Sequence, residues 1–155
     1  MPVVVSIEGG IGCGKSTVMR RLKEVFSDTP SVAFVDEPVD EWEAHGFLQR
    51  MYDEPASRPA FQFMALQSLA SEMLVALRSD PPPVLVVIER SPHGNLHTFA
   101  KANLKGADLK MFEYAWQKAL KSLPVDVDMQ YIHLETTVET LVARMRKRAR
   151  GAESK

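Results

Sequence analysis

Short apolar runs alternate along the chain with longer segments whose apolar residues recur at helical spacing. The runs are rich in β-branched residues, as is typical of strands buried in a parallel sheet, and they begin at residues 3, 32, 84 and 129. Helical spacing predicts helices at residues 18–26, 40–52, 59–78 and 108–123, and a last helix that opens near a capping box of Thr136 and Glu139. The alternation predicts an α/β fold, a parallel sheet with helices on both faces.

Composition says more about which partners the protein binds than about which fold it adopts. The 155 residues suit a single domain, residues 1–155, with 45% hydrophobic and 25% charged residues and a net charge of -1. A charge this close to zero argues against bulk binding to nucleic acid or a membrane surface, and we identify no apolar run that approaches a membrane span. The single cysteine, Cys13, fits a reducing compartment, and no leader precedes the first strand, so we expect a cytoplasmic location.

A glycine-rich loop follows the first strand. Its sequence, GGIGCGKST, matches the G-x-x-x-x-G-K-[ST] phosphate loop and stands between a strand and a helix, as that motif requires. The glycines Gly9, Gly10, Gly12 and Gly14 can take positive φ, so that backbone N–H groups turn inward around a phosphate. Lys15 supplies a charge for the outer phosphates, and the Ser16 hydroxyl is a ligand for Mg²⁺. We expect the nucleotide to contact the whole loop: Gly9, Gly10, Ile11, Gly12, Cys13, Gly14, Lys15, Ser16 and Thr17.

Charged residues follow two other strands, at the sheet edge where chemistry gathers in open α/β folds. Glu37 ends the second strand with Trp42 nearby, and Glu89 and Arg90 end the third. Transfer of a γ-phosphoryl group to an alcohol needs a carboxylate for the proton, a cation for the transferring group and an acid for Mg²⁺, and these positions offer all three. Beside a phosphate loop, the basic run at residues 144–150 favours a lid that closes over ATP.

Each of these features also has a simpler interpretation. Glu37 can be a solvated turn carboxylate, Arg90 can belong to a structural ion pair, and the basic run can be a solvated helix face or a nucleic-acid patch. Switches, motors and kinases share the phosphate loop, so the loop alone leaves the class open. A switch would show Asp-x-x-Gly after its third strand, whereas Ser-Pro-His-Gly stands at residues 91–94.

Taken together, the motifs resemble those of the deoxyribonucleoside kinase family, which includes deoxycytidine, deoxyguanosine and mitochondrial thymidine kinases. The matching segments cover nearly the whole chain in the same order: GGIGCGKST, EPVDEW, MYDEP, the helix that begins RPAFQF, IERS followed by Phe99, and RMRKRARGAE. The resemblance implies a P-loop NTPase-type sheet with an arginine-rich lid, ATP and Mg²⁺ as cofactors and a deoxyribonucleoside as substrate. Homodimers are common in this family.

The resemblance also implies roles for individual residues. Glu37 would be the general base that removes the 5′-hydroxyl proton, and Arg90 would position that hydroxyl and stabilise the transferring phosphoryl group, with Lys15 on the phosphates. Glu89 would hold Mg²⁺ with Ser16. The substrate would be bound through its 3′-hydroxyl by Tyr52 and Glu153 and at its base by Trp42 and Phe99. The lid arginines that contact ATP would be Arg144, Arg148 and Arg150.

One departure from the family pattern concerns the amide that reads the base. The family has F-x-F-Q where this chain has FQFM at residues 61–64, and Met64 cannot pair with a base edge although it stands at the substrate position. Gln67 lies one helical turn further on the face of Met64, so we expect it to supply the amide. Gln62 is expected to point elsewhere.

A second departure concerns the Arg-Asp pair of deoxycytidine kinase, at which this chain is expected to carry Ser71 and Asn95. Without that pair we do not expect strict cytidine selectivity, and a small side chain at Ser71 would leave room for thymine or a purine. Family members also continue past the lid through another helix and a fifth strand. We therefore expect a domain that lacks them, and marginal stability.

Two alternatives to a deoxynucleoside kinase stay open. A nucleoside-monophosphate kinase, such as a thymidylate kinase, shares the fold and the lid but needs extra cations for the substrate phosphate, often with an aspartate-arginine pair where this chain has Glu89 and Arg90. A truncated nucleotide-binding module without activity would bind ATP and turn over no nucleoside.

Overall fold

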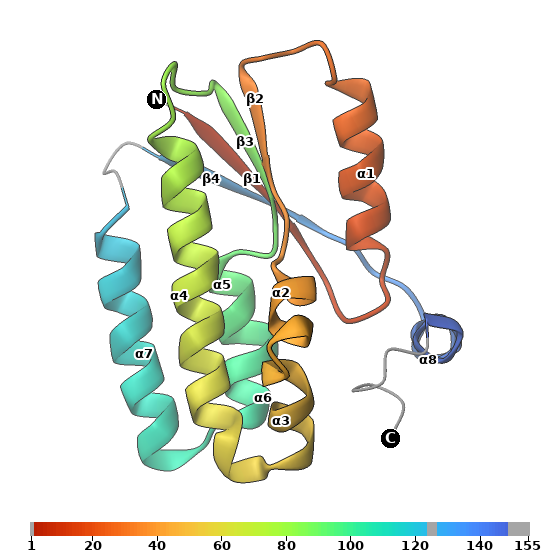
Figure 1. Cartoon of the computed structure of the whole chain (residues 1–155), viewed down its shortest axis with the longest axis vertical. Coiled ribbons are helices and arrows are strands. Elements are labelled where there is room, and N and C mark those ends of the chain that lie inside the picture. Colours follow the sequence, from red (N-terminus) through yellow and green to blue (C-terminus); the bar gives the residue numbers. More distant parts are fainter. Residues whose placement is uncertain (1, 124–126, 149–155) are drawn as a thin grey trace.

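Four parallel strands form the centre of the molecule in the computed structural model, which describes residues 2–123 and 127–148 (Figure 1). They are β1 (Val3–Glu8), β2 (Val32–Val35), β3 (Leu85–Glu89) and β4 (Asp128–His133), in the order β2-β3-β1-β4. The predicted strands are confirmed: β1 and β2 begin at the predicted residues, and β3 and β4 begin one residue away from them. Because all pairings are parallel, the carboxyl ends of the strands lie at one edge of the sheet.

Helices cover both faces of this sheet, as the sequence predicts. One face carries α1, and the other carries α4 with α7 alongside it (Figure 1); the three helices are Lys15–Val25, Arg58–Leu77 and Gly106–Lys121. Neighbouring residues of a strand point to opposite faces. Val86 of β3 thus packs in one core cluster with Met73 of α4, whereas Val87 packs in another with Met19 of α1.

The long helix α4 corrects one expectation from the sequence. A helical stretch, Pro55–Leu77, is long and apolar enough by length and composition to cross a membrane. In the fold, α4 lies against β2, β3, α3 and α7, and seven of its residues are buried. Its apolar character therefore has an explanation in core packing.

Two helical regions differ from the prediction. The helix predicted at residues 40–52 is broken into α2 (Val39–Ala44) and α3 (Phe47–Asp53), because Gly46 between them has a left-handed φ of 71°. A helical segment that the prediction missed follows β3. It consists of α5 (Pro92–Gly94), the π-helical turn η2 (Asn95–Ala100) and α6 (Lys101–Asn103), and the short 3₁₀ turn η1 (Pro55–Ser57) precedes α4.

The last helix, α8 (Val138–Arg148), forms where the sequence predicts it, but its first turn is held by a different residue. The backbone N–H of Thr140 donates to Oγ1 of Thr137 at 3.3 Å, so Thr137 makes the side-chain capping contact in place of the expected Thr136. Figure 1 shows α8 beyond the loop that joins β1 to α1.

Candidate active site

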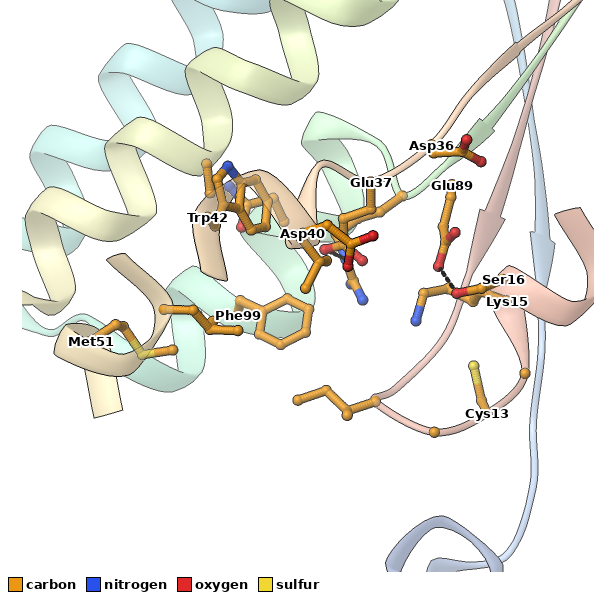
Figure 2. A pocket seen from close by; sticks show the side chains of 18 of the residues that line it. Cys13, Lys15, Ser16, Asp36, Glu37, Asp40, Trp42, Met51, Glu89 and Phe99 are labelled. Atoms are coloured by element: carbon orange, nitrogen blue, oxygen red, sulfur yellow. Dashed lines mark hydrogen bonds and ion pairs between the residues drawn. The ribbon is translucent and has the colours of Figure 1, made fainter. Parts of the chain in front are cut away.

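A cavity of about 830 Å³ opens at the carboxyl edge of the sheet, a size within the usual range for small-molecule sites. Its lining comes from the loop after β1, the ends of β2 and β3, and helices α1, α2, α3, α4, η2 and α8. Figure 2 shows the side chains of the phosphate loop at one end, and Trp42, Met51 and Phe99 at the other. Residues from distant parts of the chain therefore meet in one place.

The phosphate loop has the backbone shape that its motif predicts. Gly9 and Gly14 have φ values of 141° and 105°, in the left-handed region that favours glycine, and Gly12 also has positive φ. Gly10 is not among the positive-φ glycines, so that expectation was wrong. A Cβ at Gly9 would also stand 2.7 Å from the carbonyl oxygen of Leu134, which leaves no room for a side chain.

Lys15 lies under this loop. Its ammonium donates to the carbonyl oxygens of Gly9 at 3.2 Å and Gly10 at 3.1 Å, and the residue is 6% exposed. Burial, and next the positive charge of Arg90, lower the pKa of Lys15. Both effects disfavour the charged form, so an anionic phosphate bound here would relieve a real electrostatic cost.

Ser16 and Glu89 meet at the mouth of the loop, as the metal-site prediction requires. The hydroxyl of Ser16 donates to Oε1 of Glu89 at 2.8 Å (Figure 2). Burial, opposed by the Ser16 hydrogen bond and reinforced by Glu37, raises the pKa of Glu89. No group of three or more His, Cys, Asp or Glu side chains suited to a metal occurs in the part of the chain that the structure describes. One hydroxyl and one carboxylate fit Mg²⁺, which usually takes its other ligands from phosphates and water.

Arg90 and Glu37 form a largely buried ion pair in the lining of the cavity. Nε of Arg90 donates to Oε1 of Glu37 at 2.6 Å, with side chains that are 3% and 12% exposed. The Arg90 guanidinium also lies over the ring of Phe99, 4.2 Å from its centroid. Its Nη1 is buried without a hydrogen-bond partner among the described residues. A cation and a carboxylate are thus held together with one donor still to be satisfied.

The backbone of Arg90 is strained. Its φ is 68°, and it is the only positive-φ residue other than glycine in the described chain. This conformation costs on the order of 1 kcal/mol or more for a residue with a Cβ. Strain of this kind persists only where the surroundings hold the backbone in place.

Aromatic side chains make up the end of the cavity opposite the phosphate loop. Trp42 packs edge-on against Phe61 with ring centroids 5.5 Å apart, and both line the cavity together with Tyr52 and Phe99. The structure therefore brings Trp42, Tyr52 and Phe99 to the end at which the sequence predicts the nucleoside.

The amide at this end is Gln62, which corrects the prediction for Gln67. Gln62 is 1% exposed and lines the cavity, and its Oε1 has no hydrogen-bond partner within the described chain. Gln67 and Ser71 are exposed and lie outside the cavity lining, and Met64 packs beside the Trp42 cluster without lining the cavity. Helical geometry gives the reason: Gln62 shares the buried face of α4 with Leu66, Leu69, Met73 and Leu77, whereas residues 67 and 71 lie on another face.

Other side chains in the lining include some that the sequence reasoning missed. Asn95 is 2% exposed and lines the cavity as expected, whereas Asp36 and Asp40 were not predicted. Their positions just after β2 were the available signal. Nη1 of Arg144 in α8 donates to the carbonyl oxygens of Gly12 and Cys13, both at 3.2 Å, so this predicted lid arginine contacts the loop. Arg150, Glu153 and the side chain of Arg148 lie outside the described residues.

The cavity combines a phosphate loop with a carboxylate-guanidinium pair at the ends of neighbouring strands. The fold, a parallel sheet with a phosphate loop after its first strand, is consistent with that of a P-loop kinase. A family model described as deoxynucleoside kinase matches residues 5–155. The chain belongs to the deoxynucleoside kinase family, which confirms the resemblance seen in its motifs.

Curated relatives agree with this family. The chain is 28% identical to a thymidine kinase of Ictalurid herpesvirus 1 and 28% identical to a mitochondrial deoxyguanosine kinase of Xenopus laevis, over 98% and 96% of its length. This chain is also 27% identical to deoxycytidine kinase 2 of Gallus gallus, over 96% of the length of this chain. The chain spans 65–66% of the length of these three relatives.

Proposed function

We propose that this chain transfers the γ-phosphoryl group of ATP to the 5′-hydroxyl of a deoxyribonucleoside. The observation that carries the proposal is the ion pair of Glu37 and Arg90, 2.6 Å apart in the same cavity as the phosphate loop. A carboxylate that an arginine holds at the acceptor end has the chemistry of a general base beside the group to be transferred. Family membership supports the same reaction.

The residues divide the reaction between them. Glu37 takes the 5′-hydroxyl proton while the hydroxyl oxygen bonds to the γ-phosphorus, and the bond from that phosphorus to the bridging oxygen breaks to release ADP. Arg90 holds Glu37 and can offer its unpaired Nη1 to the transferring group. Lys15 balances the charge of the phosphates. Mg²⁺, for which Ser16 and Glu89 are the fitting residues, would neutralise charge on the β- and γ-phosphate oxygens when bound.

Two side-chain amides suit the base of the nucleoside. Gln62 has an unpaired, buried Oε1, and Asn95 has a buried Nδ2 without a partner in the described chain. An acceptor and a donor left unsatisfied in one cavity would be costly unless a ligand completes them. We propose that they read the edge of the base, which stacks among the aromatic side chains at that end of the cavity.

A nucleoside-monophosphate kinase is less well supported. Such an enzyme needs a cation at the acceptor end for the substrate phosphate. The cations among the described lining residues are Lys15, Arg90 and Arg144. Lys15 and Arg144 contact the phosphate loop, and Arg90 is paired with Glu37. The aromatic end therefore favours an uncharged nucleoside.

The test is product formation by the purified chain with Mg-ATP and, separately, thymidine, deoxycytidine, deoxyadenosine, deoxyguanosine and thymidylate. We expect a nucleoside 5′-monophosphate, and a kcat lower by about 10² to 10⁴ in Glu37→Gln. Glu41→Gln is the matched control, because Glu41 is an exposed residue of α2 outside this cavity. Product from thymidylate alone would support the monophosphate kinase instead, and no product from any substrate would contradict the proposal.

A further inference from the structure

Glu8 is a buried carboxylate that the proposed reaction does not use. It is the last residue of β1, directly before the phosphate loop, and it is 8% exposed. It does not line the cavity. A glutamate is rarely buried to this extent unless its oxygens hold other groups in place.

One oxygen of Glu8 binds the turn that follows Arg90. Its Oε1 accepts hydrogen bonds from the Ser91 backbone N–H at 2.9 Å, from the Ser91 hydroxyl at 2.6 Å and from the Ser6 hydroxyl at 2.7 Å. The Ser91 hydroxyl accepts in turn from the Gly94 N–H at 3.0 Å. A side chain of β1 thus fixes the main chain and the side chain of the residue next to Arg90.

The other oxygen of Glu8 is fitted against Gly94. Its Oε2 is buried with no hydrogen-bond partner in the described residues, and a Cβ at Gly94 would stand 1.9 Å from it. Gly94 has an ordinary helical φ of −59°, so its backbone shape does not demand glycine. The space taken by the carboxylate does. The turn therefore leaves room for the Glu8 carboxylate only when residue 94 has no side chain.

These contacts lie next to the strained residue of the site. The Arg90 N–H donates to the carbonyl oxygen of Ile7 at 3.2 Å, and Ser91 is held by Glu8, so consecutive residues of β1 anchor both sides of the positive φ at Arg90. A left-handed φ at a residue with a Cβ needs such anchors to persist. Without the Glu8 anchor, the peptide after Arg90 can relax and carry the guanidinium away from Glu37.

We propose that Glu8 is a positioning residue for phosphoryl transfer, which holds the turn at Ser91 so that Arg90 keeps its ion pair with Glu37 at the acceptor end of the cavity. The inference rests on the proposed function, which gives Arg90 its role. Since all three partners of Oε1 are donors, the turn needs an acceptor oxygen at this point. A neutral amide with that oxygen should therefore replace the carboxylate.

Two substitutions of similar size separate the need for an acceptor oxygen at residue 8 from the need for its negative charge. Glu8→Gln keeps an oxygen for the three donors, whereas Glu8→Met removes it. We expect kcat to fall by roughly 100-fold in Glu8→Met, as for a displaced positioning contact, with the KM for ATP close to that of the wild type. Glu8→Gln should restore most of kcat. Gly94→Ala, whose Cβ would occupy the space of the Glu8 carboxylate, should behave like Glu8→Met.

A control separates positioning from general destabilisation. Leu77→Ala opens a cavity in the core cluster shared by α4 and the sheet, in which Leu77 is 7% exposed. The leucine side chain makes no hydrogen bond to the turn at Ser91. It should lower the melting temperature and leave kcat per folded molecule unchanged. Equal kcat values in Glu8→Met and the wild type, or equal losses in Glu8→Met and Glu8→Gln, would overturn the proposal.

A second readout does not depend on turnover. In ¹⁵N-labelled protein, the Nε–H signal of Arg90, assigned by its loss in Arg90→Lys, reports the hydrogen bond to Glu37. We expect this signal to move or broaden in Glu8→Met and Gly94→Ala and to stay in Glu8→Gln and Leu77→Ala. A wild-type chain that phosphorylates no nucleoside would count against the proposed function, while this signal still decides the role of Glu8: an unchanged signal in Glu8→Met overturns it.

Discussion

Gln62 and Gln67 carry the same amide on one helix and have opposite surroundings. Gln62 is buried in the cavity with an unpaired oxygen, and Gln67 is exposed. We expect Gln62→Leu to lower kcat/KM for the preferred nucleoside about tenfold, the usual effect of one lost hydrogen bond to a neutral partner. The KM for ATP should stay the same. Steady-state kinetics with Gln67→Leu as the matched control tests this, and equal effects of the two substitutions would contradict it.

At the residue scale, the sequence best predicts the positions of side chains that belong to one continuous motif or to the end of a strand. The placement of Lys15, Ser16 and Glu89 could be predicted, because a strand, a loop and a helix impose the geometry and the strand ends bring the partners together. Gln62 could not be found from the spacing of the family motif. The rotation of α4 about its axis decides which amide enters the cavity, and only the full set of buried positions, residues 62, 65, 66, 69, 70, 73 and 77, reveals that rotation.

At the scale of the elements, His93 of α5 lies where the helical segment after β3 packs against its neighbours. The ring of His93 packs edge-on against Trp116 of α7 and Tyr131 of β4, and the Tyr131 hydroxyl lies 3.1 Å from Nδ1. Burial, followed by the nearby His97, lowers the pKa of His93, while Glu8 acts in the opposite direction. Protonation of His93 therefore works against the packing of α5, α7 and β4.

The sign of the pH dependence follows from this shift. In the unfolded chain His93 titrates near its ordinary pKa of about 6.5, and in the folded chain at a lower pH, so between these values the unfolded chain binds more protons. The free energy of unfolding should thus fall as the pH drops below about 6.5. Melting temperatures measured from pH 7.5 to 5.5 should fall less steeply in His93→Gln than in the wild type. His45→Gln, at an exposed histidine, is the control and should keep the wild-type slope.

Elements with a regular period could be predicted, and irregular ones could not. The four strands and α1, α4, α7 and α8 form where the apolar pattern places them. The segment at residues 92–103 has no such period, because it passes through a π-helical turn that one face of an α-helix does not describe. The break at Gly46 was missed for a related reason: a left-handed residue in a helical pattern leaves the spacing of its neighbours almost intact.

For the molecule as a whole, ligand binding should be visible as stability. Mg²⁺ with a non-hydrolysable ATP analogue at about 100 times its Kd should add about 2.7 kcal/mol to the free energy of unfolding, or roughly 5–11 °C in Tm for a domain of this size. Without ligand we expect a Tm no higher than about 65 °C. Calorimetry or a dye-based melt measures both. Lys15→Met, which removes the buried ammonium of the phosphate loop, should abolish most of the shift; a shift of wild-type size in that variant would mean that the analogue binds elsewhere.

The strand order also has a consequence for synthesis on the ribosome. Of the four described strands, β1 is made before its neighbours β3 and β4, and its register with β4 joins Val3 to Asp128. Its other neighbour, β3, starts at Leu85. One side of β1 therefore has no partner until β4 has left the exit tunnel. We expect the nascent chain to bind nucleotide only after β4 emerges, so the strand that carries the phosphate loop waits for both of its neighbours before its pairing is complete.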